Sequence, residues 1–305
     1  MLDFIYTSFN FQYYTCKIPT WYRKLVCNIK IPENTLDKIK RELKNNQLNK
    51  QGIKQLLLKI QKENARKNKT LWNFYLEETL PNRYDSLHLN IVKKSNLTAV
   101  IVEARKHPHF KVVVQNVISN LQHLNVCLHI YHGSENEIFI KESLKEYKNI
   151  KYINLNVINL DIEGYNKIML SKHFWSNFKS DKILIFQTDA ITFKPLDEKF
   201  LLYDYIGAPW KKHIRKKNKV NVGNGGLSIR SKKMMLAIIE QDIPRKKNMP
   251  EDVYICQIIK KQKYNLAIFN KAFDFATENV INTNAFGCHK IWEETTVEQL
   301  EKILK

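Results

Sequence analysis

The chain has 305 residues, 44% of them hydrophobic, and a formal net charge of +20 from 50 basic and 30 acidic residues. This composition is ordinary for a globular protein with a hydrophobic core. No apolar run approaches 18 residues and the first residues carry no basic segment, so neither a membrane span nor a secretory signal is expected.

The positive charge raises the question of a nucleic-acid partner. Only 8 of the 50 basic residues are Arg, whereas nucleic-acid readers favour Arg for bidentate contacts to bases. The composition therefore argues against nucleic acid as the main partner, although a positive surface could attract an anionic nucleotide. The five cysteines are scattered and form no CxxC pair, which predicts a reducing, cytoplasmic compartment.

Residues 1–95 differ in composition from the rest and predict a basic, mainly helical appendage. Apolar residues recur at helical spacing between Leu36 and Asn68, with Gly52 expected to divide two helices. Residues 71–76 are expected to continue as an amphipathic turn that docks on the next domain, and Pro81 to end it. An arm for oligomerisation, giving a homo-oligomer, or for acceptor docking is the alternative interpretation.

From Leu97 onward, strands are predicted to alternate with helices. The predicted strands are 97–103, 127–132, 152–155 and 183–187, and the predicted helices are 112–121, 138–147 and 167–178. This alternation is typical of a mostly parallel sheet, and nearly continuous apolar strands indicate helices on both of its faces. We therefore expect an α/β fold of Rossmann type.

The later part of the chain is less regular. We expect a short strand and turn over 205–210, a basic loop over 211–219, and helices over 231–240 and from 253 to 259. A capping-box pattern that starts at Thr295 predicts a final helix in 294–305.

Four segments carry residues with chemical potential. Gln187-Thr188-Asp189 directly follows a predicted strand, where a carboxylate can bind a divalent ion; a solvated turn is the alternative. Val222-Gly-Asn-Gly-Gly-Leu-Ser-Ile-Arg230 places three glycines in four positions, which permits positive φ and a close approach to a ligand. Asn224 offers both donor and acceptor groups, and a tight β-hairpin is the alternative for this motif.

The other two segments hold an acid pair and a histidine. Glu251 and Asp252 follow Pro250 at the start of a predicted helix, where either could serve as a general base or simply favour the helix N-terminus. His289 follows a turn and could bind a metal or phosphate, or be a structural residue. Lys290 could contact phosphate, and Trp210 offers a flat apolar face to a ligand.

Taken together, these residues resemble the GT-A superfamily of nucleotide-sugar glycosyltransferases. The sequence looks closest to a glycosyltransferase family of giant viruses and bacteria that is labelled a domain of unknown function. The resemblance rests on the segments 101–105, 174–175, 186–189, 205–210, 222–230, 250–254 and 286–290. It implies one domain over 96–293, with a nucleotide-binding half at 96–195 and an acceptor half at 196–293.

The resemblance also implies roles for individual residues. Glu103 and Arg105 would lie beside the nucleotide, with Gln187, Thr188 and Lys290 also on the donor side. Asp189 and His289 would hold Mn²⁺ or Mg²⁺, Asp252 would be the base with Glu251 as the fallback, and Asn224, Gly225, Gly226 and Trp210 would contact sugar.

One position departs from the superfamily pattern. Gln187 stands where the first acid of the DxD motif is expected, and a neutral amide is a poor ligand for a hard cation. We expect transfer of a hexose from a UDP-sugar to a hydroxyl of a glycan or glycoprotein, by inverting single displacement. The alternatives are a catalytically degenerate glycan-binding or virion structural protein, and a nucleic-acid-binding protein.

Overall fold

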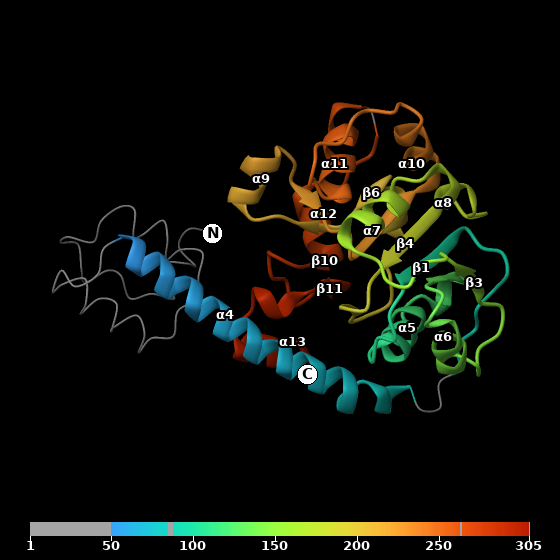
Figure 1. Cartoon of the computed structure of the whole chain (residues 1–305), viewed down its shortest axis with the longest axis horizontal. Coiled ribbons are helices and arrows are strands. Elements are labelled where there is room, and N and C mark those ends of the chain that lie inside the picture. Colours follow the sequence, from blue (N-terminus) through green and yellow to red (C-terminus); the bar gives the residue numbers. More distant parts are fainter. Residues whose placement is uncertain (1–49, 85–87, 263, 305) are drawn as a thin grey trace.

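The computed structural model describes residues 50–84, 88–262 and 264–304. It is a mixed α/β fold around a six-stranded sheet in the order β3-β2-β1-β4-β9-β6 (Figure 1). The strands are β1 (Leu97–Glu103), β2 (Cys127–His132), β3 (Lys151–Asn154), β4 (Lys182–Phe186), β6 (Tyr205–Ile206) and β9 (Leu227–Ser231). β3, β2, β1 and β4 run parallel, whereas β9 is antiparallel to both β4 and β6. The predicted mostly parallel sheet is confirmed.

Helices cover both faces of this sheet, as its apolar strands predicted. Side chains alternate between faces along a strand, and the buried residues of β1 divide accordingly. Ala99 and Ile101 share a hydrophobic cluster with α5 (Phe110–Ser119) and α6 (Glu137–Ser143). Val100 and Val102 share another with α8 (Lys172–Ser176), α10 (Lys232–Ile239) and α11 (Glu251–Lys261). The sheet is therefore the middle of three layers.

Two small sheets lie beyond the central one and bring distant parts of the chain together. β5 (Ala190–Thr192) pairs antiparallel with β11 (Gly287–His289), which pairs parallel with β10 (Ala276–Thr277). β7 (Ala208–Pro209) pairs with β8 (Val222–Gly223). Because β5 follows β4 after three residues, β11 is held next to the end of β4.

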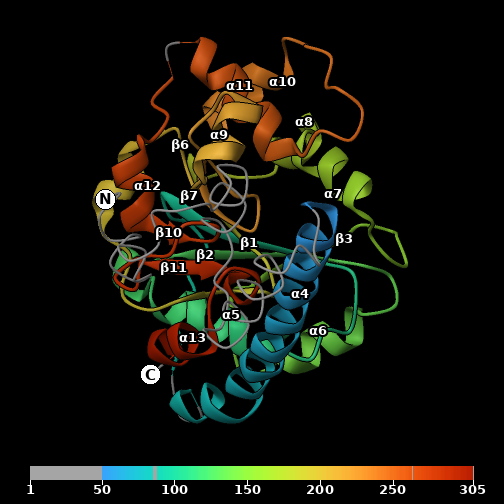
Figure 2. The same cartoon turned by 90° about the vertical axis from the view of Figure 1, so that its left-hand side faces the viewer.

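A long helix, α4 (Lys50–Phe74), runs along one side of the domain and extends beyond it (Figures 1 and 2). Its C-terminal part is firmly attached. The rings of Trp72 and Trp292 lie 5.2 Å apart, and the buried Asn68 amide donates to the carbonyls of Trp292 (3.2 Å) and Thr295 (2.7 Å). Gly52 lies within α4, so it does not divide two helices. The predicted helix before residue 50 lies outside the described residues, and the domain boundary at residue 95 stays a prediction.

The remaining elements are short. They are the π-helical turn Tyr75–Thr79, α7 (Ile162–Met169), α9 (Lys212–Asn218), α12 (Phe269–Phe275), α13 (Val297–Leu304) and 3₁₀ turns at Pro81–Arg83, Gln122–Leu124, Glu198–Leu202 and Ile291–Glu293. Thr296 and Gln299 exchange the two hydrogen bonds of a capping box before α13. No helix in the described part of the chain is long and apolar enough to cross a membrane.

Three further predicted elements differ from the structure. The helix predicted over 138–147 ends at Ser143. The helix predicted over 167–178 is divided, because the Ser171 hydroxyl accepts from the Phe174 amide and so begins α8 as a separate helix. The basic loop predicted over 211–219 contains α9, which ends where Lys219 takes a left-handed conformation (φ 58°).

Candidate active site

The candidate site lies at the carboxyl end of β4, where the turn Gln187–Asp189 leads into β5. The backbone amide of Gln187 donates to the Gly226 carbonyl at 3.0 Å. This bond joins the turn to the glycine-rich segment 223–226, which precedes β9. The Thr188 hydroxyl donates to Glu103 Oε2 at 3.3 Å, at the end of β1. Polar groups from three strands therefore meet at one edge of the sheet.

Asp189 and His289 face each other at this edge. The antiparallel pairing of β5 with β11 sets His289 opposite Ala190, and His289 Nε2 lies 3.2 Å from Asp189 Oδ1. Both atoms are buried, and among the described residues neither has a hydrogen-bond partner beyond this ion-pair contact. On the other side of the ring, Nδ1 lies 3.0 Å from Glu278 Oε1. His289 is thus held by one carboxylate while its second nitrogen points at another.

The charges of this cluster depend on one another. Burial favours neutral His289, but the adjacent carboxylates of Asp189 and Glu278 raise the pKa of His289 to about 9. Burial also favours neutral Asp189, yet His289 and Lys290 hold the pKa of Asp189 well below its usual value. Lys290 Nζ lies 3.5 Å from Asp189 Oδ2, so Asp189 is an ionised carboxylate with positive charge on two sides.

The glycine-rich segment packs directly against these groups. A Cβ atom added at Gly226 would lie 2.2 Å from His289 Nε2, and one at Gly225 would lie 2.7 Å from Glu251 Oε1. No described glycine has positive φ, so close packing, and not the expected left-handed conformation, is what requires glycine here. The segment also joins β8 in one sheet to β9 in another, and therefore is not a hairpin.

Asn224 takes the left-handed conformation itself (φ 88°). Its Oδ1 atom accepts hydrogen bonds from the amides of Gly226 (2.9 Å) and Leu227 (3.1 Å), which fixes the turn. The buried Nδ2 atom has no hydrogen-bond partner among the residues that the structure describes. Asn224 therefore keeps an unused donor group in the turn whose Gly226 packs against His289.

The two adjacent acids have different surroundings. Glu251 forms a bidentate ion pair with Arg230 (2.7 and 2.9 Å), and both residues are buried. Asp252 is partly buried, and its Oδ2 atom accepts a hydrogen bond from the backbone amide of Asn224 at 2.8 Å. Burial, followed by the charge of Glu251, raises the pKa of Asp252 to about 6. At neutral pH, Asp252 is a carboxylate with raised basicity, whereas both oxygens of Glu251 are engaged.

Glu103 and Arg105 form a second bidentate pair beside the Asp189 turn. Arg105 Nε and Nη2 each lie 2.8 Å from a Glu103 oxygen. The side-chain amide of Asn136 donates to the backbone carbonyls of Glu103 and Arg105. Glu103 is buried while the Arg105 side chain is 60% exposed. This pair therefore presents a guanidinium to solvent next to the site.

Trp210 is brought close to the glycine segment but is not open to solvent. Its ring packs over Gly223, where a Cβ atom would lie 1.9 Å from it, and the residue is 5% exposed. The expected flat face for a sugar ring is thus largely covered by the protein.

The separation of Asp189 Oδ1 and His289 Nε2 fits two ligands of one divalent ion. Two ligands of an octahedral ion, each about 2.1 Å from it, stand about 3.0 Å apart, close to the separation of Asp189 Oδ1 and His289 Nε2. An imidazole that donates through its other nitrogen to a carboxylate is the usual arrangement of a metal-binding histidine. Among the described residues, no group of three or more His, Cys, Asp or Glu side chains could hold an ion. The protein would therefore supply two ligands and leave the rest to a ligand and water.

Sequence reasoning missed three contributors to this arrangement. Glu278 lies in no recognisable motif, and only the fold of β10 against β11 brings it to His289. Tyr165 comes from α7, and its hydroxyl lies 3.4 Å from the Gly225 carbonyl. Arg230 ends the glycine motif, but its pairing with Glu251 had no sequence signal beyond the opposite charges.

Comparison with known proteins gives one family match and several structural ones. Residues 148–289 match the family described as "Protein of unknown function (DUF5672)". This range holds Asp189, the glycine segment, the acid pair and His289, and leaves out β1, β2 and α4. The sequence matches no curated protein.

The fold is similar to three glycosyltransferases. They are the galactosyltransferase LgtC in complex with donor and acceptor sugar analogs (13% identity, TM-score 0.43, covering 68% of this chain and 95% of that one), the mannosyltransferase PcManGT from Pyrobaculum calidifontis in complex with GDP-Man and Mn²⁺ (7%, 0.40, 66% and 62%), and mouse xyloside xylosyltransferase 1 (9%, 0.42, 63% and 97%). All three TM-scores lie below 0.5.

Proposed function

We propose that this protein is a glycosyltransferase that moves a hexose from a UDP-sugar to a hydroxyl of a glycan or glycoprotein. The observation that carries the proposal is the buried pair Asp189 Oδ1 and His289 Nε2, which lie 3.2 Å apart and have no further hydrogen-bond partner among the described residues. Buried polar atoms normally have hydrogen-bond partners, and these two have only each other, at a separation that suits two ligands of one divalent ion. Lys290 and the exposed guanidinium of Arg105 add positive charge suited to a nucleotide diphosphate.

Asp189 and His289 would hold the divalent ion, Mn²⁺ or Mg²⁺. When bound, such an ion neutralises charge on a departing diphosphate. Glu278 would orient His289 through Nδ1, and Lys290 would place a further cation next to the phosphates. Gln187 adds no negative charge, so this site would depend on fewer protein carboxylates than a site with a DxD motif.

Asp252 is the best candidate for the general base. Its pKa of about 6 leaves it unprotonated at neutral pH yet basic enough to accept a proton. The acceptor hydroxyl oxygen would attack the anomeric carbon, the bond from that carbon to the diphosphate would break, and the hydroxyl proton would pass to Asp252. Glu251 would serve a positioning role instead, because Arg230 occupies both of its oxygens.

A panel of nucleotide sugars with and without Mn²⁺ tests the proposal. A ligand that binds only the native state raises the melting temperature, so a UDP-sugar with Mn²⁺ should stabilise the wild type more than either alone. Asp189→Asn should lose this joint effect and donor turnover while it keeps its fold by circular dichroism. Full turnover of Asp189→Asn in EDTA would remove the metal from the proposal.

A catalytically degenerate glycan-binding protein is the second candidate. It is favoured by Gln187 and by the small number of acidic ligands near Asp189. Hydrolysis of UDP-glucose, UDP-galactose or UDP-N-acetylglucosamine by the wild type separates the two, since a binding protein gives no release of UDP.

A further inference from the structure

Positive charge is concentrated on α4, outside the site described above. Its 25 residues hold six Lys, one Arg and one Glu, and so contribute six of the chain's twenty net positive charges. Lys59, Lys62, Arg66 and Lys69 follow one another at steps of three and four residues, which places them on one face of the helix. All four are exposed, and none forms an ion pair with another described residue.

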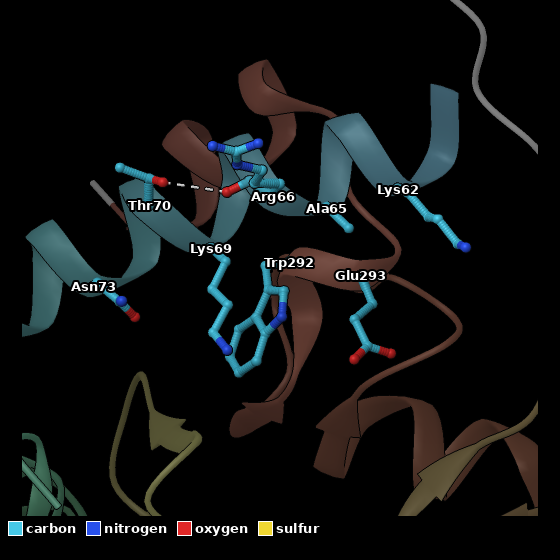
Figure 3. Close-up of a pocket in the computed structure, with 8 residues that line it drawn as sticks. All are labelled: Lys62, Ala65, Arg66, Lys69, Thr70, Asn73, Trp292 and Glu293. Carbon is cyan, nitrogen blue, oxygen red and sulfur yellow. Dashed lines mark hydrogen bonds between the residues drawn. The ribbon is translucent and has the colours of Figure 1, made fainter. Parts of the chain in front are cut away.

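This basic face borders a groove of about 620 Å³ between α4 and the turn Ile291–Glu293. Figure 3 shows Lys62, Arg66 and Lys69 on α4, with Lys69 extended alongside the Trp292 ring and Arg66 directed away from Trp292 and Glu293. Lys69 Nζ lies 5.9 Å from the centre of the Trp292 ring. The groove is thus lined by cations from α4, an aromatic ring and a carboxylate.

The groove is fixed in position relative to the candidate active site. Trp292 follows His289 by three residues, and consecutive Cα atoms are about 3.8 Å apart, so their Cα atoms lie within about 11 Å. The buried Asn68 and Trp72 contacts attach α4 to this same turn. The groove and the candidate site are therefore close neighbours, joined by the segment from His289 to Trp292.

We infer that this groove, the α4 groove, binds an acidic glycan as the acceptor of the proposed glycosyl transfer, on which the inference rests. Cations that repeat about every 5 Å along a helix match single charges on successive sugars of an extended polysaccharide. Glu293 and Asn73 can take hydrogen bonds from sugar hydroxyls. Three of the four cations are Lys, whereas nucleic-acid recognition favours Arg.

Binding of labelled oligosaccharides to the full chain tests the assignment. The probe is a fluorescein-labelled polygalacturonate oligosaccharide, compared by anisotropy with its methyl ester, which has the same sugars without the charge. The acid form should bind at least about tenfold more tightly, with an affinity that falls as salt rises. Equal binding of acid and ester would overturn the assignment.

A matched pair of variants locates the site. Lys62→Gln, Arg66→Gln and Lys69→Gln together remove three charges and retain good helix formers; Lys93→Gln, Lys94→Gln and Lys148→Gln remove three exposed charges elsewhere. The first triple should bind the acid probe about tenfold or more weakly and flatten its logarithmic salt dependence by about two, while the second should bind as the wild type does. Equal losses in both triples would overturn the assignment.

Two further measurements separate this inference from the proposed function. Stabilisation by UDP with Mn²⁺ should be the same in the α4 triple variant and the wild type, because the donor site is untouched. Carboxylate-dependent binding without UDP-sugar turnover would support the groove and remove the transfer activity. Tighter binding of single-stranded DNA of equal charge through the same three residues would assign the groove to nucleic acid and overturn the inference.

Discussion

Glu278 Oε1 lies 3.0 Å from His289 Nδ1, on the side of the ring opposite Asp189. This contact fixes which nitrogen faces Asp189, and outer carboxylates of this kind typically change metal affinity 10- to 100-fold. Glu278→Gln should therefore weaken Mn²⁺ binding in the presence of UDP by about that factor, measured by isothermal titration calorimetry. Glu77→Gln is the matched control, since Glu77 contacts His109 at 2.9 Å outside the site. Equal affinity in the two variants would contradict the role of Glu278.

Gly226 leaves no room for a side chain next to His289. An added Cβ atom would lie 2.2 Å from Nε2, so Gly226→Ala must displace the ring or the turn. A displacement near 1 Å can cost about 10²-fold in rate, and we expect a loss of this size in UDP-sugar turnover. The control is Gly164→Ala in α7, where the new Cβ atom would lie 2.9 Å from the flexible end of the Leu160 side chain. Turnover in the control should be unchanged; an active Gly226→Ala enzyme would show that His289 is not needed in place.

Asp252 should set the acidic limb of the pH profile. Burial and the charge of Glu251 raise the pKa of Asp252 to about 6, and only the unprotonated form accepts a proton. The value of kcat/KM should therefore rise tenfold per pH unit below 6 and level off near pH 7. Asp252→Asn should lower kcat by about 10²- to 10⁴-fold and remove this limb. Asp181→Asn, which alters a carboxylate that accepts from Ser231 away from the site, should keep the limb.

Removing one partner of the Arg230–Glu251 ion pair should lower the free energy of unfolding strongly, whereas replacing both partners with apolar residues should lower it little. Both side chains are buried, at 0% and 3% exposure, so Glu251→Gln leaves an uncompensated guanidinium and should lower the free energy of unfolding by about 3–5 kcal/mol. Combining Arg230→Met with Glu251→Leu should restore most of that loss, because no buried charge remains. Urea denaturation measures both. The exposed pair Lys141–Glu137 provides the control, and Glu137→Gln should hardly move the midpoint.

The sheet could be predicted from sequence because its strands are apolar on both faces. Leu97–Glu103 and Cys127–His132 were predicted with the bounds that the structure has, and the period of the intervening helix was equally clear. The break at Ser171 and the helix after Lys211 were not predicted. The first depends on a single cap, and the second has few apolar residues to give a helical period.

The site was only partly visible in the sequence. Asp189, the glycines and His289 stood out because each follows an apolar run or forms a dense motif, and the structure brings them together. Glu278 could not be found, since its contact arises from the pairing of β10 with β11, far from any local pattern. The sequence also could not show why glycine is required at 225 and 226, because their close packing against Glu251 and His289 arises only in the tertiary structure.

The register of β9 against β4 has a consequence for how this chain can vary in length. Phe186 pairs with Leu227 and Ile183 with Arg230, so the same ladder buries apolar residues and aims Arg230 at Glu251. Since a one-residue slip turns every side chain of a strand to the other face, one inserted or deleted residue in 227–231 would bury the wrong side chains and withdraw the glycine turn from His289. Length changes in 227–231 would therefore abolish both folding and ligand recognition. The mostly exposed segment 240–249 after α10 should tolerate them.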